Sequence, residues 1–173
     1  MNNKSNKKDQ NSAEVKIIVP EISNEHSFLI KKSEKRVIIV MDMGKPKREE
    51  CTLCLNLASR SGTGVETIKE YLENMDRFIP VKIGSSKKYS ILSRESIIYV
   101  LEKEKADLYS FFQYDLLLTG NINIRVGQFM NMPQPDGRLL DFLLKEENFV
   151  PFLFRGSKIH VNRNKIIKGY DNE

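Results

Sequence analysis

The sequence predicts a mainly β protein of the α+β class, with two tandem β-β-α-β-β units after an N-terminal tail. The first observation is a repeat. ETIKEYLENMDRFIPVKI followed by YSILSRESII recurs later as RLLDFLLKEENFVPFLF followed by KIHVNRNKII. The second is a series of short apolar runs, several with period two, bounded by glycine-containing turns, as is typical of strands. The third is that each unit has a single stretch with helical spacing of its apolar residues.

The two copies are separated by a nearly constant distance. Phe78 and Phe149 are 71 residues apart (149 − 78), and Arg94 and Arg163 are 69 apart (163 − 94). A unit of about 65 residues has little core of its own. We therefore expect the copies to fold together, either as two packed barrels or as one shared sheet.

Composition and pattern divide the chain into five segments. They are a basic tail expected to be disordered (1–14), short strands with a charged connector (15–36), the first repeat (37–106), the second repeat (107–168) and a C-terminal tail (169–173). The stretch Glu102–Leu108, between the repeats, is expected to be helical.

The first repeat opens with two predicted strands. Val37–Met43 is an apolar run that ends at Gly44, which is typical of a buried strand and its turn. In Cys51–Leu57 the apolar residues alternate with polar ones, so one face of that strand is expected to be buried.

A helix and the closing strands of the first repeat follow. Thr63 and Glu66 have the spacing of a capping box, and Val65 begins the apolar helical face. Phe78–Ile83 is predicted to be a strand, with its proline at an edge or bulge. The stretch 89–101 is predicted to form one strand or two short ones.

The second repeat has the same predicted order. It comprises strands at Phe111–Thr119 and Asn121–Met130, a helix at Arg138–Lys145, and strands at Phe149–Phe154 and Lys158–Ile167. The first two strands flank Gly120, as the first two strands of the other copy flank a glycine.

Charge and cysteine content limit the class of protein. The chain has 173 residues, a net charge of +5 and two cysteines, which cannot build a disulfide framework. Its longest apolar run, Val37–Met41, is too short to span a bilayer, and the N-terminus lacks the apolar core of a secretory signal. We expect a cytoplasmic protein that does not contact membranes.

The repeat resembles two kinds of small β domain. VIIVMDMG followed by YSILSRESIIYV, and LLLTG followed by IHVNRNKII, are similar to strands of the Sm-like small β-barrel. The helix of the repeat differs in position: it follows the second strand, whereas Sm proteins place a helix before the first strand. The helix-strand signature is similar to that of uncharacterised bacterial β-rich domains. These resemblances imply a fold and assign no chemistry.

No residue pattern predicts catalysis, a metal site or a cofactor. Cys51 and Cys54 form a Cys-x-x-Cys pair, but it lies in a predicted strand and has no second pair, so two separate packing or surface cysteines are expected. Arg138 and Asp141 are three residues apart on one helix, where a local ion pair is the simpler interpretation and a ligand-binding pair the alternative. We expect a protein that is not an enzyme.

Basic residues gather around the last turn of each repeat. They are Lys82, Lys87, Lys88 and Arg94 in the first copy, and Arg155, Lys158, Arg163, Lys165 and Lys168 in the second. Repeated cations can bind phosphates, whereas lysines on terminal strands can also prevent unwanted strand pairing.

Two functions remain open from the sequence. The first is a non-catalytic binding or adaptor module that presents its tandem β units to a protein partner or, through edge strands, to its own copies. The alternative is an RNA- or DNA-binding protein that uses the basic hairpins of both repeats.

Overall fold

The computed structural model describes residues 32–57, 62, 64–74, 78–106, 108, 110–129, 138–145 and 148–172. The predicted disordered tail at 1–14, and the strand candidates that precede residue 32, lie outside the described residues.

Strands dominate the described chain, which confirms the mainly β class. The strands are β1 (Lys32–Asp42), β2 (Pro46–Asn56), β3 (Phe78–Ile83), β4 (Tyr89–Ser93), β5 (Ile97–Lys105), β6 (Ser110–Leu118), β7 (Ile122–Phe129), β8 (Phe149–Phe154), β9 (Ser157–Asn162) and β10 (Ile166–Asn172). The helices are α1 (Ile68–Asn74) and α2 (Leu139–Lys145), with 3-10 turns η1 (Arg94–Ser96) and η2 (Arg163–Lys165).

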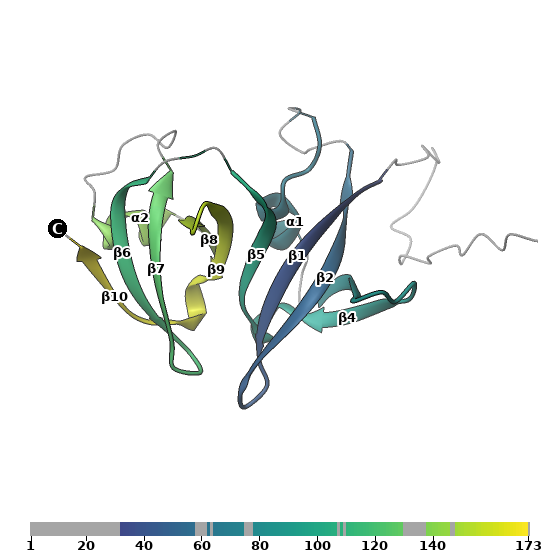
Figure 1. The fold of residues 1–173 in the computed structure, drawn as a ribbon, viewed down its shortest axis with the longest axis horizontal. Helices are drawn as coiled ribbons and strands as arrows, with labels where there is room; N and C mark the ends of the chain where they lie inside the picture. Colours follow the sequence, from purple (N-terminus) through teal and green to yellow (C-terminus); the bar gives the residue numbers. More distant parts are fainter. Residues whose placement is uncertain are drawn as a thin grey trace, which may run out of the picture.

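All ten strands belong to one antiparallel sheet. Their spatial order is β10-β6-β7-β8-β9-β5-β1-β2-β3-β4 (Figure 1). The sheet contains one run of strands from residues 32–105 and another from residues 110–172, which we call the first half and the second half. They meet where β5 pairs with β9, and β4 and β10 are the terminal strands of the order.

The same succession of elements occurs in both halves: two strands, a helix, two strands, a 3-10 turn and a strand. The spatial order of strands within each half is also the same. The strand predicted at Lys158–Ile167 is wrong as a single element, because η2 divides it into β9 and β10. The Asn162 side chain accepts a hydrogen bond from the Asn164 amide, which stabilises this turn.

Two predicted boundaries and one predicted helix are also wrong. β1 begins at Lys32, inside the expected connector, and β10 runs to Asn172, inside the expected C-terminal tail. Most of Glu102–Leu108 is strand β5 instead of helix. Its alternating charges form ion pairs with neighbouring strands, such as that between Lys35 and Glu104, so they are typical here of an exposed strand end.

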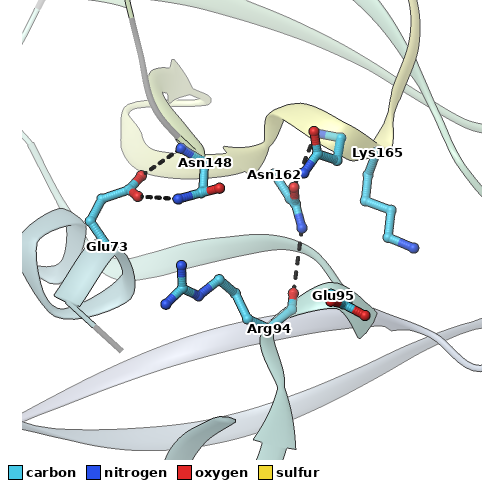
Figure 2. Close-up of a pocket in the computed structure, with 7 residues that line it drawn as sticks. Glu73, Arg94, Glu95, Asn148, Asn162 and Lys165 are labelled. Carbon is cyan, nitrogen blue, oxygen red and sulfur yellow. Dashed lines mark hydrogen bonds between the residues drawn. The ribbon is translucent and has the colours of Figure 1, made fainter. Parts of the chain in front are cut away.

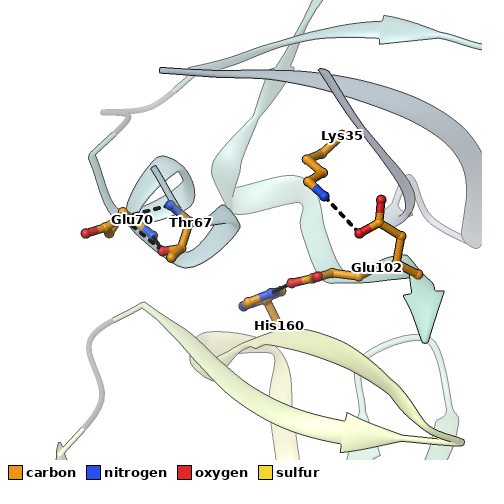
Figure 3. Close-up of polar contacts among 6 residues, drawn as sticks. Lys35, Thr67, Glu70, Glu102 and His160 are labelled. Atoms are coloured by element: carbon orange, nitrogen blue, oxygen red, sulfur yellow. Dashed lines mark hydrogen bonds and ion pairs between the residues drawn. The ribbon is translucent and has the colours of Figure 1, made fainter. Parts of the chain in front are cut away.

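The capping box of α1 is displaced from the predicted one. Thr63 lies outside the described residues, whereas Glu66 is buried and accepts a hydrogen bond from the Asn56 amide. Thr67 and Glu70 form the reciprocal pair instead: the Glu70 amide donates to the Thr67 hydroxyl oxygen, and the Thr67 amide donates to the Glu70 carboxylate (Figure 3). Val65 precedes the helix and is exposed, so its predicted place on the apolar face is wrong.

The predicted edge or bulge at Pro80 has a different explanation. β3 pairs with β2 only through Lys82 and Ile83, so Pro80 lies beyond the paired part of these two strands. The missing N–H of proline therefore removes no hydrogen bond to β2. The Pro80 carbonyl accepts a hydrogen bond from the Tyr71 hydroxyl, which fixes α1 over the strand.

Among the described residues the apolar core has two clusters, and each contains residues of both halves. The first cluster holds mainly first-half side chains, such as Leu53 and Leu72, but also the fully buried Phe149 of β8. The second holds mainly second-half side chains but also Ile98 of β5, together with Ile38. Each half therefore contributes apolar side chains to the core of the other half where the two meet.

Candidate functional site

The junction between the halves, which we call the seam, is the pairing of β5 with β9. Tyr99, Val100 and Leu101 lie opposite residues 161, 160 and 159 respectively. The buried His160 contacts Glu102 through its Nε2 atom, 2.8 Å from the carboxylate oxygen (Figure 3). The seam therefore joins the halves through backbone pairing and a polar side-chain contact.

A second contact at the seam joins α1 to the start of β8. The Glu73 carboxylate accepts hydrogen bonds from the Asn148 amide and the Asn148 side chain, at 3.0 and 2.8 Å (Figure 2). It also accepts one from the Phe149 amide, at 2.6 Å. Each bond to a charged acceptor is stronger than a neutral one. Glu73 thus holds the chain in the position that places Phe149 in the first core cluster.

A polar cavity of about 750 Å3 lies beside these contacts. It is lined by Glu73, Arg94, Glu95, Asn148, Asn162, Asn164 and Lys165, and so receives residues from both halves (Figure 2). Asn162 donates from its amide nitrogen to the Ile97 carbonyl, so its amide is engaged in structure. The Arg94 Nε atom is buried and has no hydrogen-bond partner among the described residues. Arg94 is therefore a cation in the wall of this cavity with one buried N–H group that no described residue satisfies.

The structure distributes the other basic residues over several places. Arg94 and Lys165, from different halves, share the cavity, and the Lys165 ammonium lies 3.4 Å from Asp42. Lys82 bonds to Glu34, and this hydrogen bond raises the pKa of Lys82. Lys87 and Lys88 are exposed in the turn between β3 and β4.

The remaining cations lie in the second half. Arg155 lies over the Phe154 ring in the turn between β8 and β9, and Lys168 lies over the Tyr170 ring on β10. Arg163 donates to the Leu143 carbonyl of α2. Lys158 is half-buried on β9. Only Arg94 and Lys165 of the nine predicted cations line this cavity at the seam.

The structure describes only one side chain of the predicted pair on α2, Arg138 and Asp141. Arg138 is exposed immediately before α2, and the Asp141 side chain lies outside the described residues. The start of α2 is held from β10 instead, where the Asp171 carboxylate accepts a hydrogen bond from the Leu139 amide at 2.7 Å. This bond attaches α2 to the terminal strand of the sheet.

Both cysteines are free and buried in β2. Burial raises the pKa of Cys51 to about 11, and the nearby Glu49 contributes to the shift. The Cys54 sulfur lies 2.7 Å from the Tyr89 hydroxyl. A thiol that keeps its proton is a poor nucleophile and a poor metal ligand. The described residues contain no group of three or more metal-ligating side chains.

The two ends of the sheet carry most of the exposed large apolar side chains. Among the described residues nine such side chains are exposed, and six lie at the ends. Phe78 and Ile91, on β3 and β4, form what we call the β4 end. Leu140 and Leu144 of α2, with Ile167 and Tyr170 of β10, form what we call the β10 end.

The polar residues of the seam were missed from the sequence. Glu73, Asn148 and Asn162 belong to no catalytic or metal motif, so nothing singled them out. A signal exists in the comparison of the two copies: Glu73 corresponds to Leu144 (73 + 71), and His160 corresponds to Ile91 (160 − 69). In both pairs the polar residue lies at the seam and its apolar counterpart lies at an end of the sheet.

Comparison with protein-family models, curated proteins and solved structures found no match for this chain. Within the described residues, neither helix has the length and apolar character needed to cross a membrane.

Proposed function

We propose that this chain is a non-catalytic binding or adaptor module, made of two copies of one β-rich unit, whose sheet ends bind protein partners. The observation that supports it is the placement of Phe78, Ile91, Leu140, Leu144, Ile167 and Tyr170 at the two ends, each at least half exposed. Exposed apolar side chains gathered beside unpaired strand edges are typical of protein-binding surfaces.

The character of β4 supports the same proposal. Strands at the edge of a sheet usually carry charges or prolines that prevent pairing with another chain. β4 has the sequence YSILS, which contains neither, and Ile91 at its centre is 69% exposed. An edge without such protection is suited to accept a strand from a partner.

The repetition of element order supports the tandem interpretation and the resemblance to Sm-like small barrels. Each half runs through five strands, with a 3-10 turn before the fifth. In both halves, the helix stands between the second and third strands, as the sequence predicts. A cytoplasmic location belongs to the same proposal and rests on the two free cysteines.

A capture experiment tests the adaptor function. Immobilised wild-type chain is incubated with lysate of its own cells, with and without nuclease, beside an Ile91→Lys variant and a Lys87→Ala control in the neighbouring turn. We expect bound proteins that resist nuclease, are lost with Ile91→Lys and remain with Lys87→Ala. Proteins that bind Ile91→Lys and wild type equally would contradict the proposal.

Nucleic-acid binding is the second candidate, and Arg94 in the cavity wall, whose buried Nε has no partner among the described residues, favours it. A guanidinium pairs well with a phosphate, and Lys165 adds a second cation from the other half. Arg94→Gln and Lys165→Gln should then each weaken binding of generic single-stranded RNA, and rising salt should weaken wild-type binding. Absence of wild-type binding at low salt would exclude this candidate.

A further inference from the structure

We infer that copies of this chain join head to tail, with the β10 end of one copy pairing with the β4 end of the next. This inference rests on the proposed function, because it names a second copy as the partner of both sheet ends. The seam inside each chain is the template, since it already joins strand five of one half to strand four of the other.

The strand order makes the two ends counterparts of the seam. Each half has its strands in the order fifth, first, second, third, fourth. The seam uses the fifth strand of the first half, β5, and the fourth strand of the second half, β9. The strands that remain unpaired on their outer sides among the described residues are the fourth of the first half, β4, and the fifth of the second half, β10 (Figure 1).

The side chains at the ends correspond to those that the seam buries. Phe149 is fully buried in the core of the first half, and its counterpart Phe78 is 60% exposed. Ile98 is fully buried in the core of the second half, and its counterpart Ile167 (98 + 69) is 61% exposed. These counterparts lack the neighbouring half that covers the residues at the seam.

The helices follow the same correspondence. At the seam, α1 approaches the start of β8 through Glu73. The counterpart of Glu73 is Leu144, and the counterpart of Lys69 is Leu140 (69 + 71); both leucines are exposed on α2. An apolar α2 surface would therefore meet the exposed Phe78 of the next copy. The polar contact of the seam becomes an apolar contact between copies.

The seam also gives the strand register. At the seam, residues 161, 160 and 159 lie opposite 99, 100 and 101. A shift of 69 residues places Leu92 opposite Lys168, Ile91 opposite Gly169, and Ser90 opposite Tyr170 of the neighbouring copy. Leu139 of α2 fills the space beside Gly169 where a side chain would stand, so Ile91 of the neighbouring copy would lie beside this leucine.

A head-to-tail contact uses two different surfaces of each copy. Each added copy therefore leaves one free end of each kind, so further copies can join. The result is a closed ring when the rotation from copy to copy returns to the first copy, and a filament when it does not. A contact between two identical ends would stop at a dimer. This difference allows a direct test with the complete purified chain.

The first test blocks one end at a time. Wild type, Phe78→Lys and Ile167→Lys are studied by native mass spectrometry and sedimentation over a concentration series, with Lys87→Ala as control and circular dichroism to check folding. We expect wild type and the control to exceed the dimer. Each blocked variant should be monomeric, and their mixture should give dimers of twice 20.1 kDa and nothing larger.

The second test checks the register. Ser90→Cys combined with Tyr170→Cys in one chain should give a ladder of disulfide-linked copies under mild oxidation, because directly opposed residues are within disulfide reach. Ser86→Cys with Tyr170→Cys is the control outside this register and should not form the ladder. Equal ladders from both variants would overturn the proposed pairing.

Several results would overturn the inference. They are a wild-type chain that stays monomeric at all concentrations, blocked variants that still form dimers alone, and a mixture that remains monomeric. Protection of the β4 amides from hydrogen exchange in a monomeric wild type would assign that edge to residues 1–31 of the same chain. A monomeric chain that still captures lysate proteins through Ile91 would overturn self-assembly but leave the adaptor function standing.

Discussion

At the scale of single residues, the side chains that hold this protein together act across long sequence separations. Glu73 receives three hydrogen bonds from residues 75 and 76 positions away, and His160 meets Glu102 across the seam. A carboxylate that accepts three hydrogen bonds is costly to replace, because its donors would be left unsatisfied. These residues determine where the halves meet.

The buried thiol of Cys51 gives a prediction about pH. Its pKa is raised to about 11 in the folded chain, against 9.0 for the free group. Between these values the unfolded chain releases this proton while the folded chain keeps it, so stability falls as the pH rises. The urea midpoint should decrease from pH 8 to pH 11, and Cys51→Ala should show a smaller decrease. Equal decreases in both chains would contradict this role of Cys51.

At the scale of elements, the two short helices are stabilised in different ways. The first turn of α1 is closed by its own residues, Thr67 and Glu70, whereas α2 begins with an amide bonded to Asp171 of β10. A seven-residue helix is marginal by itself and depends on packing and caps. The cap of α2 therefore also fixes this helix to the end of the sheet.

Thr67→Ala should lower the free energy of unfolding by about 1 kcal/mol, because it removes the hydroxyl that accepts from the Glu70 amide. Urea denaturation measures this change. Ser85→Ala, in the exposed turn between β3 and β4, is the matched control and should change stability little. If both substitutions have the same small effect, the capping pair does not stabilise α1.

At the scale of the whole molecule, the seam makes one sheet and two interlocked cores. Phe149 lies in the first cluster and Ile98 in the second, so neither half keeps its core without the other. Removal of a side chain at this position should therefore weaken both halves. We expect thermal unfolding of the described region to occur in a single transition.

Phe149→Ala should cost about 3 to 5 kcal/mol, which is typical for removal of a fully buried phenylalanine. Phe78→Ala is the matched control at the equivalent repeat position. It should change stability little when both are measured in an Ile167→Lys background that prevents assembly. Two separate calorimetric transitions in the Phe149→Ala chain would show that the halves unfold independently.

The amino-acid sequence was sufficient for the mainly β class, the order of the principal strands and the two helices. Apolar periodicity and glycine turns are local signals, and they specify elements of this kind. The capping pair at Thr63 and Glu66 was wrong because α1 begins later, at Ile68. The helix predicted at 102–108 was wrong because alternating charges also suit an exposed strand, whose Lys103 and Glu104 form ion pairs with residues of β2 and β1.

The sequence by itself determined that the chain carries a repeated pattern, because the two patterns lie 69 to 71 residues apart. Only the tertiary structure decided where these stretches meet. Pairing of β5 with β9 joins residues about 60 positions apart, and no local signal specifies such a contact. The tertiary structure also decided which of two equivalent residues is covered. Phe149 is buried against the other half, whereas Phe78 remains exposed. The physical reason is that, within a single chain, β5 pairs with β9 while β4 and β10 remain at opposite ends of the sheet.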